Sequence, residues 1–430
     1  MRLRGNIALV LAIAAGLGGS ATAAAAADVP DPAATVRASI AVDGTTQGDD
    51  DSFSPSVSAD GRYVTYFTWA GNLTGDGQWH WGDLMLFDTA EQKTTVIADT
   101  NCGFNGGAMG TTATISADGR YVAFDSPCGH VPDDTDMRAD IYVWDRLTGT
   151  FSRIGASQVA TPKPGSTHPA ISADGRFTAF ESVHRDVVPS DTNWVSDVFL
   201  TDRQAGTTAR VSVNTAGKQA NGWSGGASIS GDGKFVVFES DATNLVANDT
   251  NGKRDVFLRD VAGKRTVRLS GGVGAAEANG KTFAPRISAD GKFVTFGSEA
   301  TNLVPGETAT GQDQYLYDRK AKVTRRIAPA GAHGYDGSPS GDGRLIAFSS
   351  PDPIDPADTN GSTDVYVYDR VAGTYQRVSA ATDGSQSDGS SFGAALSEDG
   401  GFVAYSSDAS TLVPGDTNGK RDVFRSPAHR

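Results

Sequence analysis

The chain has 430 residues, a formal net charge of −14, 52 glycines and two cysteines. An acidic chain of this kind has no electrostatic basis for binding the phosphates of nucleic acid, so we exclude a nucleic-acid partner. Its length would ordinarily suggest two or three domains, but the repeats described below favour one.

Residues 1–27 have the pattern of an export signal. Arg2 and Arg4 give a basic start, residues 7–17 form an apolar stretch, and a run of small residues comes next. The apolar stretch is too short for a permanent membrane span, and no other segment is apolar enough. We therefore expect residues 1–27 to be a cleaved signal peptide and residues 28–430 to be one secreted domain with no membrane span.

One phrase, Ser-x-Asp-Gly-Arg/Lys in six of its copies, occurs seven times after the signal. The copies stand at nearly equal intervals, so nearly the whole mature chain is one unit written seven times. A long and regular repeat of this kind is typical of a ring of sheets. The copies begin at Ser58, Ser116, Ser172, Ser230, Ser288, Ser340 and Ser397.

The fourth copy indicates how each unit folds. Residues 227–230 and 234–239 are strand-like runs joined by an Asp-Gly turn, which predicts a tight hairpin. After a long polar loop, residues 255–260 and 265–270 form a second pair of expected strands. No segment has a helical period with caps. The sequence therefore predicts an all-β, seven-bladed β-propeller of four-stranded antiparallel blades.

The two ends of the chain are expected to complete one blade together. The last copy stops after its third expected strand, residues 422–425, so one fourth strand is missing. Residues 37–44 near the amino terminus match residues 377–384, the fourth strand of the sixth copy, at identical spacing. We expect this N-terminal strand to pair in the last blade, which would leave no open sheet edge at the seam.

The repeat phrase, followed by an aromatic-Val-x-Phe strand and then Asp-Val-Phe/Tyr-x-x-Asp, resembles the WD40-like (PD40) repeats of TolB-type β-propellers. The resemblance covers residues 35–430 and implies a propeller fold. TolB looks like a six-bladed propeller behind a separate α/β domain, so its role in the Tol–Pal system does not carry over. The family also includes propellers attached to prolyl-peptidase domains, which raises the question of an enzyme.

Loop lengths distinguish the two faces of the expected ring. The turns after the first and third strands of each unit are tight, whereas the loops after the second and fourth strands are long, so the long-loop face is the candidate binding face. Cys102 and Cys128 both fall on that face, around the second blade. In an exported protein we expect them to form a disulfide; the alternative is a free reactive thiol.

A second repeated phrase, Asp-Thr-Asn-Gly-x-x-Asp in its fullest form, occupies five long loops. Its oxygen side chains surround a glycine turn and would suit Ca²⁺, which takes six to eight oxygen ligands. The alternative is that these Asp and Asn side chains cap their own turns, since the spacing is not that of an EF-hand. The candidate ligands are Asp134, Asp136 and Asp140; Asp191, Asn193 and Asp197; Asp249, Asn251 and Asp255; Asp358, Asn360 and Asp364; and Asp416, Asn418 and Asp422.

The long loop of the first blade carries three tryptophans, Trp69, Trp79 and Trp81. Their position among polar side chains favours a patch that stacks on sugars or anchors a protein ligand. The alternative is that they pack over an irregular loop. Trp194 and Trp223 occupy neighbouring long-loop positions and would enlarge the patch.

Hydrolase motifs are present only as fragments. Residues 222–226 and 389–393 match Gly-x-Ser-x-Gly, but each leads into an expected strand, whereas a nucleophile elbow needs a strand, a sharp turn and then a helix. The six histidines occupy unlike places in their repeats, so we expect no shared histidine site. The repeat phrase also differs from the Asp-box of sialidases, because Gly directly follows Asp.

We therefore predict a secreted, monomeric, TolB-like propeller that acts as a binding or scaffolding module for a protein or carbohydrate ligand through its long-loop face. No catalytic residue is assigned, and Ca²⁺ is the one cofactor considered. Two alternatives stay open. The first is an extracellular hydrolase or lyase that acts on polysaccharide or peptide through convergent carboxylates at the channel mouth. The second is a calcium-stabilised structural protein of the envelope.

Overall fold

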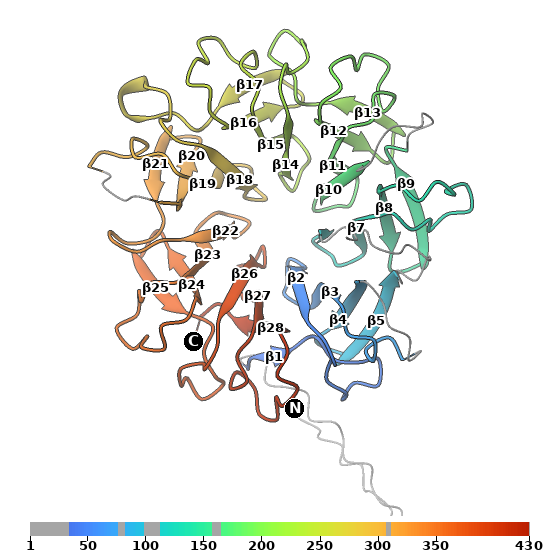
Figure 1. Cartoon of the computed structure of the whole chain (residues 1–430), viewed down its shortest axis with the longest axis vertical. Helices are drawn as coiled ribbons and strands as arrows, with labels where there is room; N and C mark the ends of the chain where they lie inside the picture. The colour runs from blue at the N-terminus through green and yellow to red at the C-terminus, as the bar shows by residue number, and fades with distance from the viewer. Residues whose placement is uncertain (1–33, 76–81, 99–111, 157–164, 307–310, 430) are drawn as a thin grey trace, which may run out of the picture. The chain divides into compact units, whose positions relative to one another are not determined.

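The computed structural model describes residues 34–75, 82–98, 112–156, 165–306 and 311–429. The chain divides into the units Met1–Asp31 and Pro32–Arg430. The second unit contains seven four-stranded antiparallel sheets arranged around a central axis (Figure 1), which confirms the predicted seven-bladed β-propeller. Within the described residues the one helical segment is the 3₁₀ helix η1 (Val273–Ala275). No helix among these residues has the length and apolar character needed to cross a membrane.

Each blade has its first strand nearest the axis and its fourth strand at the rim (Figure 1). Blade 1 contains β2 (Ser52–Val57), β3 (Tyr63–Thr68), β4 (Asp83–Asp88) and β5 (Lys93–Ala98). Blade 2 contains β6 (Ala113–Ile115), β7 (Tyr121–Ser126), β8 (Asp140–Asp145) and β9 (Thr150–Ile154). Blade 3 contains β10 (Ser166–Ile171), β11 (Phe177–Ser182), β12 (Asp197–Asp202) and β13 (Thr207–Arg210). Blade 4 contains β14 (Ser224–Ile229), β15 (Phe235–Ser240), β16 (Asp255–Asp260) and β17 (Arg265–Arg268).

The remaining blades have the same order. Blade 5 contains β18 (Thr282–Ile287), β19 (Phe293–Ser298), β20 (Asp313–Asp318) and β21 (Val323–Arg326). Blade 6 contains β22 (Tyr335–Pro339), β23 (Leu345–Ser350), β24 (Asp364–Asp369) and β25 (Thr374–Arg377). Blade 7 contains β26 (Ser391–Leu396), β27 (Phe402–Ser407), β28 (Asp422–Pro427) and β1 (Val36–Arg37).

Blade 7 is assembled from both ends of the described chain. Its strand order is β1, β28, β27 and β26, and Val36 of β1 lies opposite Arg425 of β28 in an antiparallel pair. The N–H of Ala38 then donates to the carbonyl of Val423 at 2.7 Å, so the pairing continues past the end of β1. In this arrangement β1 covers the outer edge of β28.

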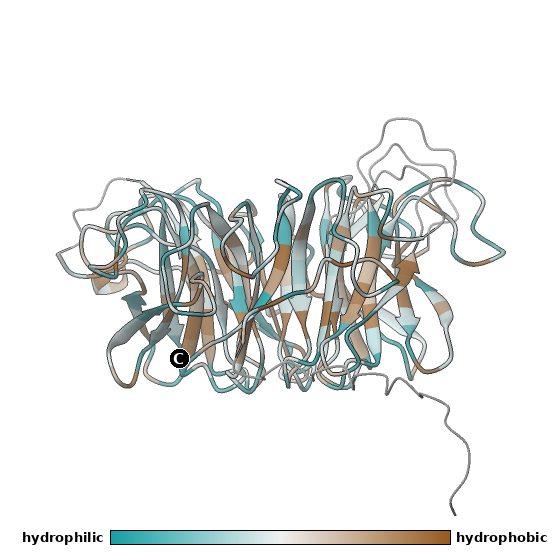
Figure 2. Cartoon of the chain, turned by 90° about the horizontal axis from the view of Figure 1, so that it is seen from below, coloured by the Kyte–Doolittle hydropathy of each residue, from teal (hydrophilic) through white to brown (hydrophobic). Residues whose placement is uncertain are grey.

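Apolar residues lie within the strands, between the two loop-bearing faces (Figure 2). In β15, Val236, Val237 and Phe238 are fully buried, as expected for strands packed between neighbouring sheets. Phe238 stacks on Phe257 of β16 with 5.8 Å between ring centroids. Equivalent pairs join Phe124 to Tyr142, Phe180 to Phe199, Phe296 to Tyr315 and Tyr405 to Phe424. These aromatic pairs give blades 2, 3, 4, 5 and 7 a similar core.

The repeated Ser-x-Asp-Gly phrase forms a belt of backbone hydrogen bonds at the short-loop end. In blade 1, the hydroxyl of Ser58 donates to Asp60 at 2.7 Å and accepts from the N–H of Tyr63 at 2.9 Å, which fixes the turn. The N–H of Ala59 then donates to the carbonyl of Ala117 in the next blade at 3.0 Å. The other links run from Ala117 to Ala173, Ala173 to Gly231, Gly231 to Ala289, Asp290 to Gly341, Gly341 to Glu398 and Asp399 to Ala59. The belt joins all seven blades.

The glycine of the phrase is needed for two reasons. Gly61 has a φ of +72°, in the left-handed region that glycine enters without steric cost. A Cβ atom there would also lie 2.2 Å from the ring of Phe402 in blade 7. Gly119 makes the same close approach to Tyr63 of blade 1. Six of the seven turns therefore pack their glycine against an aromatic ring of the preceding blade, and in the seventh Gly400 packs against Leu345.

Candidate functional site

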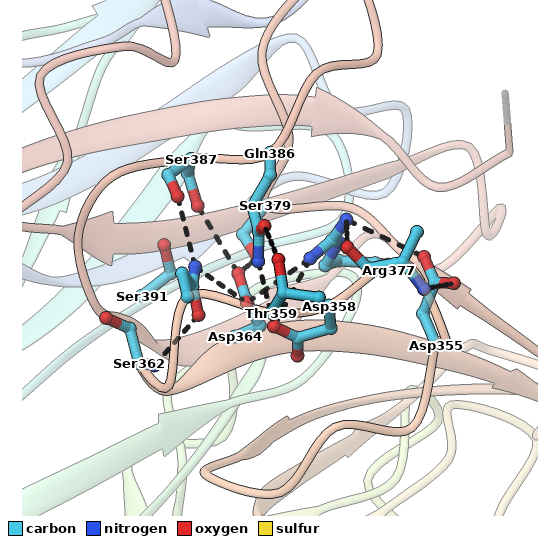
Figure 3. A network of polar contacts seen from close by, with 12 residues as sticks. Asp355, Asp358, Thr359, Ser362, Asp364, Arg377, Ser379, Gln386, Ser387 and Ser391 are labelled. Carbon is cyan, nitrogen blue, oxygen red and sulfur yellow. Dashed lines mark hydrogen bonds and ion pairs between the residues drawn. The ribbon is translucent and has the colours of Figure 1, made fainter.

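The acidic loops predicted to hold calcium enclose arginine side chains (Figure 3). In blade 6, the guanidinium of Arg377 lies 3.4 Å from a carboxylate oxygen of Asp358 and 3.7 Å from one of Asp364. Ser379, close after Arg377 in the chain, donates its hydroxyl to Asp364. A guanidinium therefore supplies positive charge between the first and last aspartates of the phrase, where a metal ion was predicted.

The same arrangement, which we call the Asp–Arg clamp, recurs in four other blades. In each, an arginine from the rim strand contacts the first and last aspartates of the loop phrase. The clamps join Arg37 to Asp416 and Asp422, Arg153 to Asp134 and Asp140, Arg210 to Asp191 and Asp197, and Arg268 to Asp249 and Asp255. The clamps tie each long loop to the rim of its own blade.

The asparagines of the phrase cap turns. The side-chain oxygen of Asn251 accepts from the N–H of Lys253, and its amide donates to Asp255. The side chains of Asn193, Asn360 and Asn418 are used in similar ways within their loops. These contacts support the turn-capping interpretation, while calcium binding stays a prediction.

Burial changes the acidity of the clamp carboxylates. It raises the pKa of four aspartates to about 6: Asp140, Asp249, Asp364 and Asp416. Blade 2 brings three carboxylates closest together, since oxygens of Asp134, Asp136 and Asp140 lie within 4.8 Å of one another. Arg153 nevertheless lies within 3.9 Å of all three. Even this group therefore has a cationic partner within the protein.

Aromatic side chains remain exposed on the long loops. Trp69 is 44% exposed and packs edge-on against Phe53 of β2, with 4.8 Å between ring centroids. Trp194 is 67% exposed, and the guanidinium of Arg185 lies 3.8 Å from its ring centre. Such a cation–π contact orients the indole while leaving its other face open. These two tryptophans are available to a ligand.

Three predicted residues fall outside the described part of the chain. Trp79 and Trp81 lie in the gap between residues 75 and 82, so the complete tryptophan patch stays a prediction. Cys102 lies in the next gap, and its proposed partner Cys128 is buried. The disulfide stays a prediction as well.

The first strands line a central channel, and six of them share a β-bulge near their long-loop end. The bulge residue of each has a left-handed φ. Glycine occupies this position in two blades, whereas four blades carry Ser54, His168, Ala284 and Asp336. A left-handed conformation is uncommon for residues other than glycine, and such backbone strain concentrates at functional sites. His168 and Asp336 are the charged or titratable members of this ring.

The channel contains a cavity of about 350 Å³ between blades 1, 2, 5, 6 and 7. Most of its lining residues are small, and five of them carry hydroxyl groups: Ser54, Ser56, Thr112, Thr114 and Ser338. Arg286 and Asp336 are its two charged lining residues. This volume lies at the lower end of the range of small-molecule sites.

The second strands break the symmetry of the ring at their fifth residue, near the long-loop end. Blades 2, 3 and 4 carry Asp125, Glu181 and Glu239 there, which we call the acidic arc. The other blades carry Phe67, Gly297, Ser349 and Ser406. Glu181 accepts a hydrogen bond of 3.0 Å from the N–H of the bulge residue Gly226 in the next blade. Burial raises the pKa of Glu239, which lies 3.5 Å from Arg254.

His168 lies beside the acidic arc. Its Nδ1 is 2.8 Å from Glu181, and this hydrogen bond raises the pKa of the imidazole. Its side chain is 56% exposed, and Nε2 has no hydrogen-bond partner among the described residues. Asp125 is 3% exposed, burial raises its pKa, and its Oδ1 has no hydrogen-bond partner among those residues. A histidine held by a carboxylate through one nitrogen is suited to proton transfer through the other.

Sequence reasoning missed both the clamps and His168. The Arg-x-Ser pattern of the fourth strands, as in Arg377-Val-Ser379, was a signal for a partner to the loop aspartates. The signal for the acidic arc lay in the aligned second strands, where only three consecutive repeats carry an acid. His168 could have been found from Glu181, which lies across the hairpin from it. A comparison of the histidine positions alone does not show this neighbour.

No protein-family model and no curated protein matches the sequence, but solved structures match the fold. An oligogalacturonate lyase in complex with manganese is 16% identical, with a TM-score of 0.54 over 88% of this chain and 89% of that chain. The β-propeller domain of the Trilobed protease from Pyrococcus furiosus is 11% identical, with a TM-score of 0.53 over 88% and 96%. TolB from Acinetobacter baumannii is 16% identical, with a TM-score of 0.41 over 81% and 76%. TolB proteins and other β-propellers are thus among the structures that this chain resembles, and likenesses at such low identity concern the fold alone.

Proposed function

We propose that this protein is an exported, monomeric binding module that receives a protein or carbohydrate ligand at the long-loop face, over the mouth of the channel. The observation that carries the proposal is the acidic arc with its neighbour His168. A position with a purely structural role would carry the same kind of residue in every blade. At this position, however, acidic residues occur in three consecutive blades and in no other blade. Such a departure from symmetry favours a ligand site over a structural role.

The exposed tryptophans support the choice of ligand. Trp194 and Trp69 offer flat apolar surfaces on long loops, and such surfaces stack on sugar rings or anchor protein side chains. The acidic arc lies toward the same end of the blades. A ligand that carries both apolar and hydrogen-bonding groups therefore fits this face better than a purely apolar one.

Glycan-array and calorimetric binding measurements on the mature chain test this proposal. We expect Trp194→Ala to weaken binding without changing the melting temperature. Leu147 is a matched control, because it is 64% exposed but lies in the tight turn between β8 and β9 on the short-loop face. Equal losses of binding affinity for Trp194→Ala and Leu147→Ala, or no bound ligand at all, would contradict binding through the long-loop face.

A second candidate function is an extracellular hydrolase or lyase that acts on polysaccharide or peptide at the channel mouth. The observation that favours it is the 2.8 Å contact between His168 and Glu181, which leaves Nε2 facing away from the carboxylate. Product release from a polysaccharide or peptide, abolished by His168→Gln without loss of folding, would establish the enzyme. Binding without turnover would instead favour the module.

The third alternative, a calcium-stabilised envelope protein, has less support because the Asp–Arg clamps already contain a cationic group. Export itself can be tested directly. N-terminal sequencing of the protein recovered from the culture medium should begin between residues 24 and 28, and a product that retains residues 1–27 would contradict cleavage of a signal peptide.

A further inference from the structure

Arg286 differs from its counterparts in every other blade. It is the fifth residue of the first strand β18, and the same position holds Ser56, Thr114, Ala170, Ser228, Ser338 and Ala395 elsewhere. The six counterparts are small, so a ring of this kind folds without an arginine here. Arg286 lines the channel cavity and is exposed within it. A long cationic side chain therefore occupies a position where a small residue is sufficient for packing.

Asp336 is the one acidic residue among the six bulge positions. It is the bulge residue of β22 in the neighbouring blade, with a φ of 57°. Gly226 and Gly393 occupy the same position in two other blades and adopt that conformation without steric cost. Asp336 is exposed in the same cavity as Arg286. A carboxylate is thus held in a strained backbone position that glycine would fill more easily.

The two charges influence each other without forming an ion pair. Both side chains reach the solvent of the channel, yet the surrounding ring of strands desolvates them. This desolvation lowers the pKa of Arg286 and raises that of Asp336, and each charge opposes the shift of the other. Among the described residues, none forms a hydrogen bond or ion pair with either charged side chain. The cavity therefore presents one cation and one anion on adjacent blades, and arginine binds carboxylates well through its planar fork of donors.

We infer that the channel binds a small molecule that carries a carboxylate and, close to it, an ammonium or amide N–H, with the carboxylate on Arg286 and the nitrogen on Asp336. The surrounding hydroxyls of Ser54, Ser56 and Thr114 suit the remaining polar groups of such a molecule. This site goes beyond the proposed function, because it needs neither the tryptophans nor a macromolecular ligand.

Calorimetry with amino carboxylates of increasing length, from glycine through β-alanine and 4-aminobutyrate to 5-aminopentanoate, tests the inference on the mature chain. The series varies the separation of the two charges, so one length should match the cavity. We expect at least one compound to bind with a Kd below about 1 mM. Its carboxamide, which lacks the negative charge, should bind at least about tenfold more weakly.

Three variants of Arg286 and Asp336 show which end of the ligand each residue binds. Arg286→Gln should weaken the best compound at least about tenfold, whereas Arg286→Lys should retain part of the affinity. Asp336→Asn should remove the preference for the free amine over its N-acetyl derivative. Arg325→Gln is the matched control, because Arg325 is exposed on β21, away from the cavity lining. Melting temperatures of all variants show whether the fold is intact.

The inference fails if no compound in the series binds the wild-type chain, or if Arg286→Gln binds as well as the wild type. Because these compounds contain neither a sugar nor a protein surface, their failure would leave binding at the long-loop face untouched. Conversely, an empty glycan array alongside a channel-bound amino carboxylate would remove the carbohydrate ligand from the proposed function and support the channel site.

Discussion

The backbone N–H of Asp399 in blade 7 donates a hydrogen bond of 3.0 Å to the carbonyl of Ala59 in blade 1. This is the link that closes the belt at the short-loop end, since the other links run from blade to blade in chain order. It joins the last copy of the repeated phrase to the first, from nearly opposite ends of the chain. The phrase is therefore repeated because each copy must bond to the next.

The glycine of that phrase gives the first prediction. Gly61→Ala places a methyl group 2.2 Å from Phe402 in addition to straining a left-handed backbone. We expect the free energy of unfolding to fall by about 2 to 4 kcal/mol. Gly149→Ala is the matched control: its φ is +69°, but nothing lies within 4 Å of the added carbon. Denaturant titration should show a loss of only about 1 kcal/mol for this variant, and equal losses would contradict the packing argument.

The second prediction concerns the clamps. Arg377 is 9% exposed, and its replacement by Gln leaves Asp358 and Asp364 buried without their cation. Breaking a buried pair in this way costs about 3 to 5 kcal/mol. Arg344 in the same blade pairs with Asp369, but its side chain is 55% exposed, so Arg344→Gln should cost less than about 1 kcal/mol. Similar losses for the two variants would mean that the clamp has no special role.

The decrease in the free energy of unfolding that Arg377→Gln causes should also depend on pH. Burial already raises the pKa of Asp364 from 3.8 to about 6 in the folded wild type, and removal of the guanidinium raises it further. A raised pKa means that the folded state binds the proton more tightly, so this contribution to stability is complete below pH 3.8 in both chains. It is lost by about pH 6 in the wild type, whereas in the variant the loss continues to higher pH. Denaturant titrations of both chains should therefore show a larger deficit at about pH 8 than at about pH 5. A deficit that is constant with pH would contradict this account.

Local sequence signals were sufficient for the ring but not for the contacts between strands. The Asp-Gly turns, the alternating strands and the spacing of the copies each predict one blade, and seven copies predict the ring. In the fourth copy the expected strands at residues 227–230 and 234–239 became β14 (Ser224–Ile229) and β15 (Phe235–Ser240). The expected strand at residues 255–260 matched β16, and that at residues 265–270 ended earlier, at Arg268. Such shifts at strand ends are ordinary, because ends depend on tertiary hydrogen bonds.

The candidate site was less accessible from the sequence. Asp364 is the first residue of the β24–β25 hairpin and Arg377 is the last. The two side chains meet only because β24 and β25 pair across a turn. The sequence alone does not show this strand pairing, so the acidic phrase resembles a binding site for a metal cation. Arg286 and Asp336 belong to different blades, and only the bulges and the curvature of the ring bring them to one cavity. Their signal is comparative: each departs from its counterparts in the other blades.

The third prediction tests the metal alternative. If the clamp arginines supply the positive charge within the acidic loops, the melting temperature should be the same in EDTA and in excess Ca²⁺. Blade 2 gives the strictest test of this expectation, because the carboxylates of Asp134, Asp136 and Asp140 converge there. An upward shift with Ca²⁺ that disappears in Asp136→Asn would contradict this expectation and establish a calcium site in that loop. Asp133→Asn, an exposed acid nearby, is the control for a nonspecific loss of charge.

The last prediction concerns Asp125, the most buried member of the acidic arc at 3% exposed. Burial raises its pKa from 3.8 to about 7, and the charge of His168 opposes this shift. The folded chain therefore holds this proton more tightly than the unfolded chain, so its contribution to stability is complete below pH 3.8 and is lost as the pH rises to about 7.

Asp125→Asn removes this titration while keeping the shape of the side chain. The variant should gain stability relative to the wild type as the pH rises from about 4 to about 7, because the wild type alone must ionise a buried carboxyl group. Melting temperatures measured side by side across this range provide the test. A difference that does not vary with pH would mean that Asp125 is not a buried acid facing the channel histidine, and would remove one member from the acidic arc.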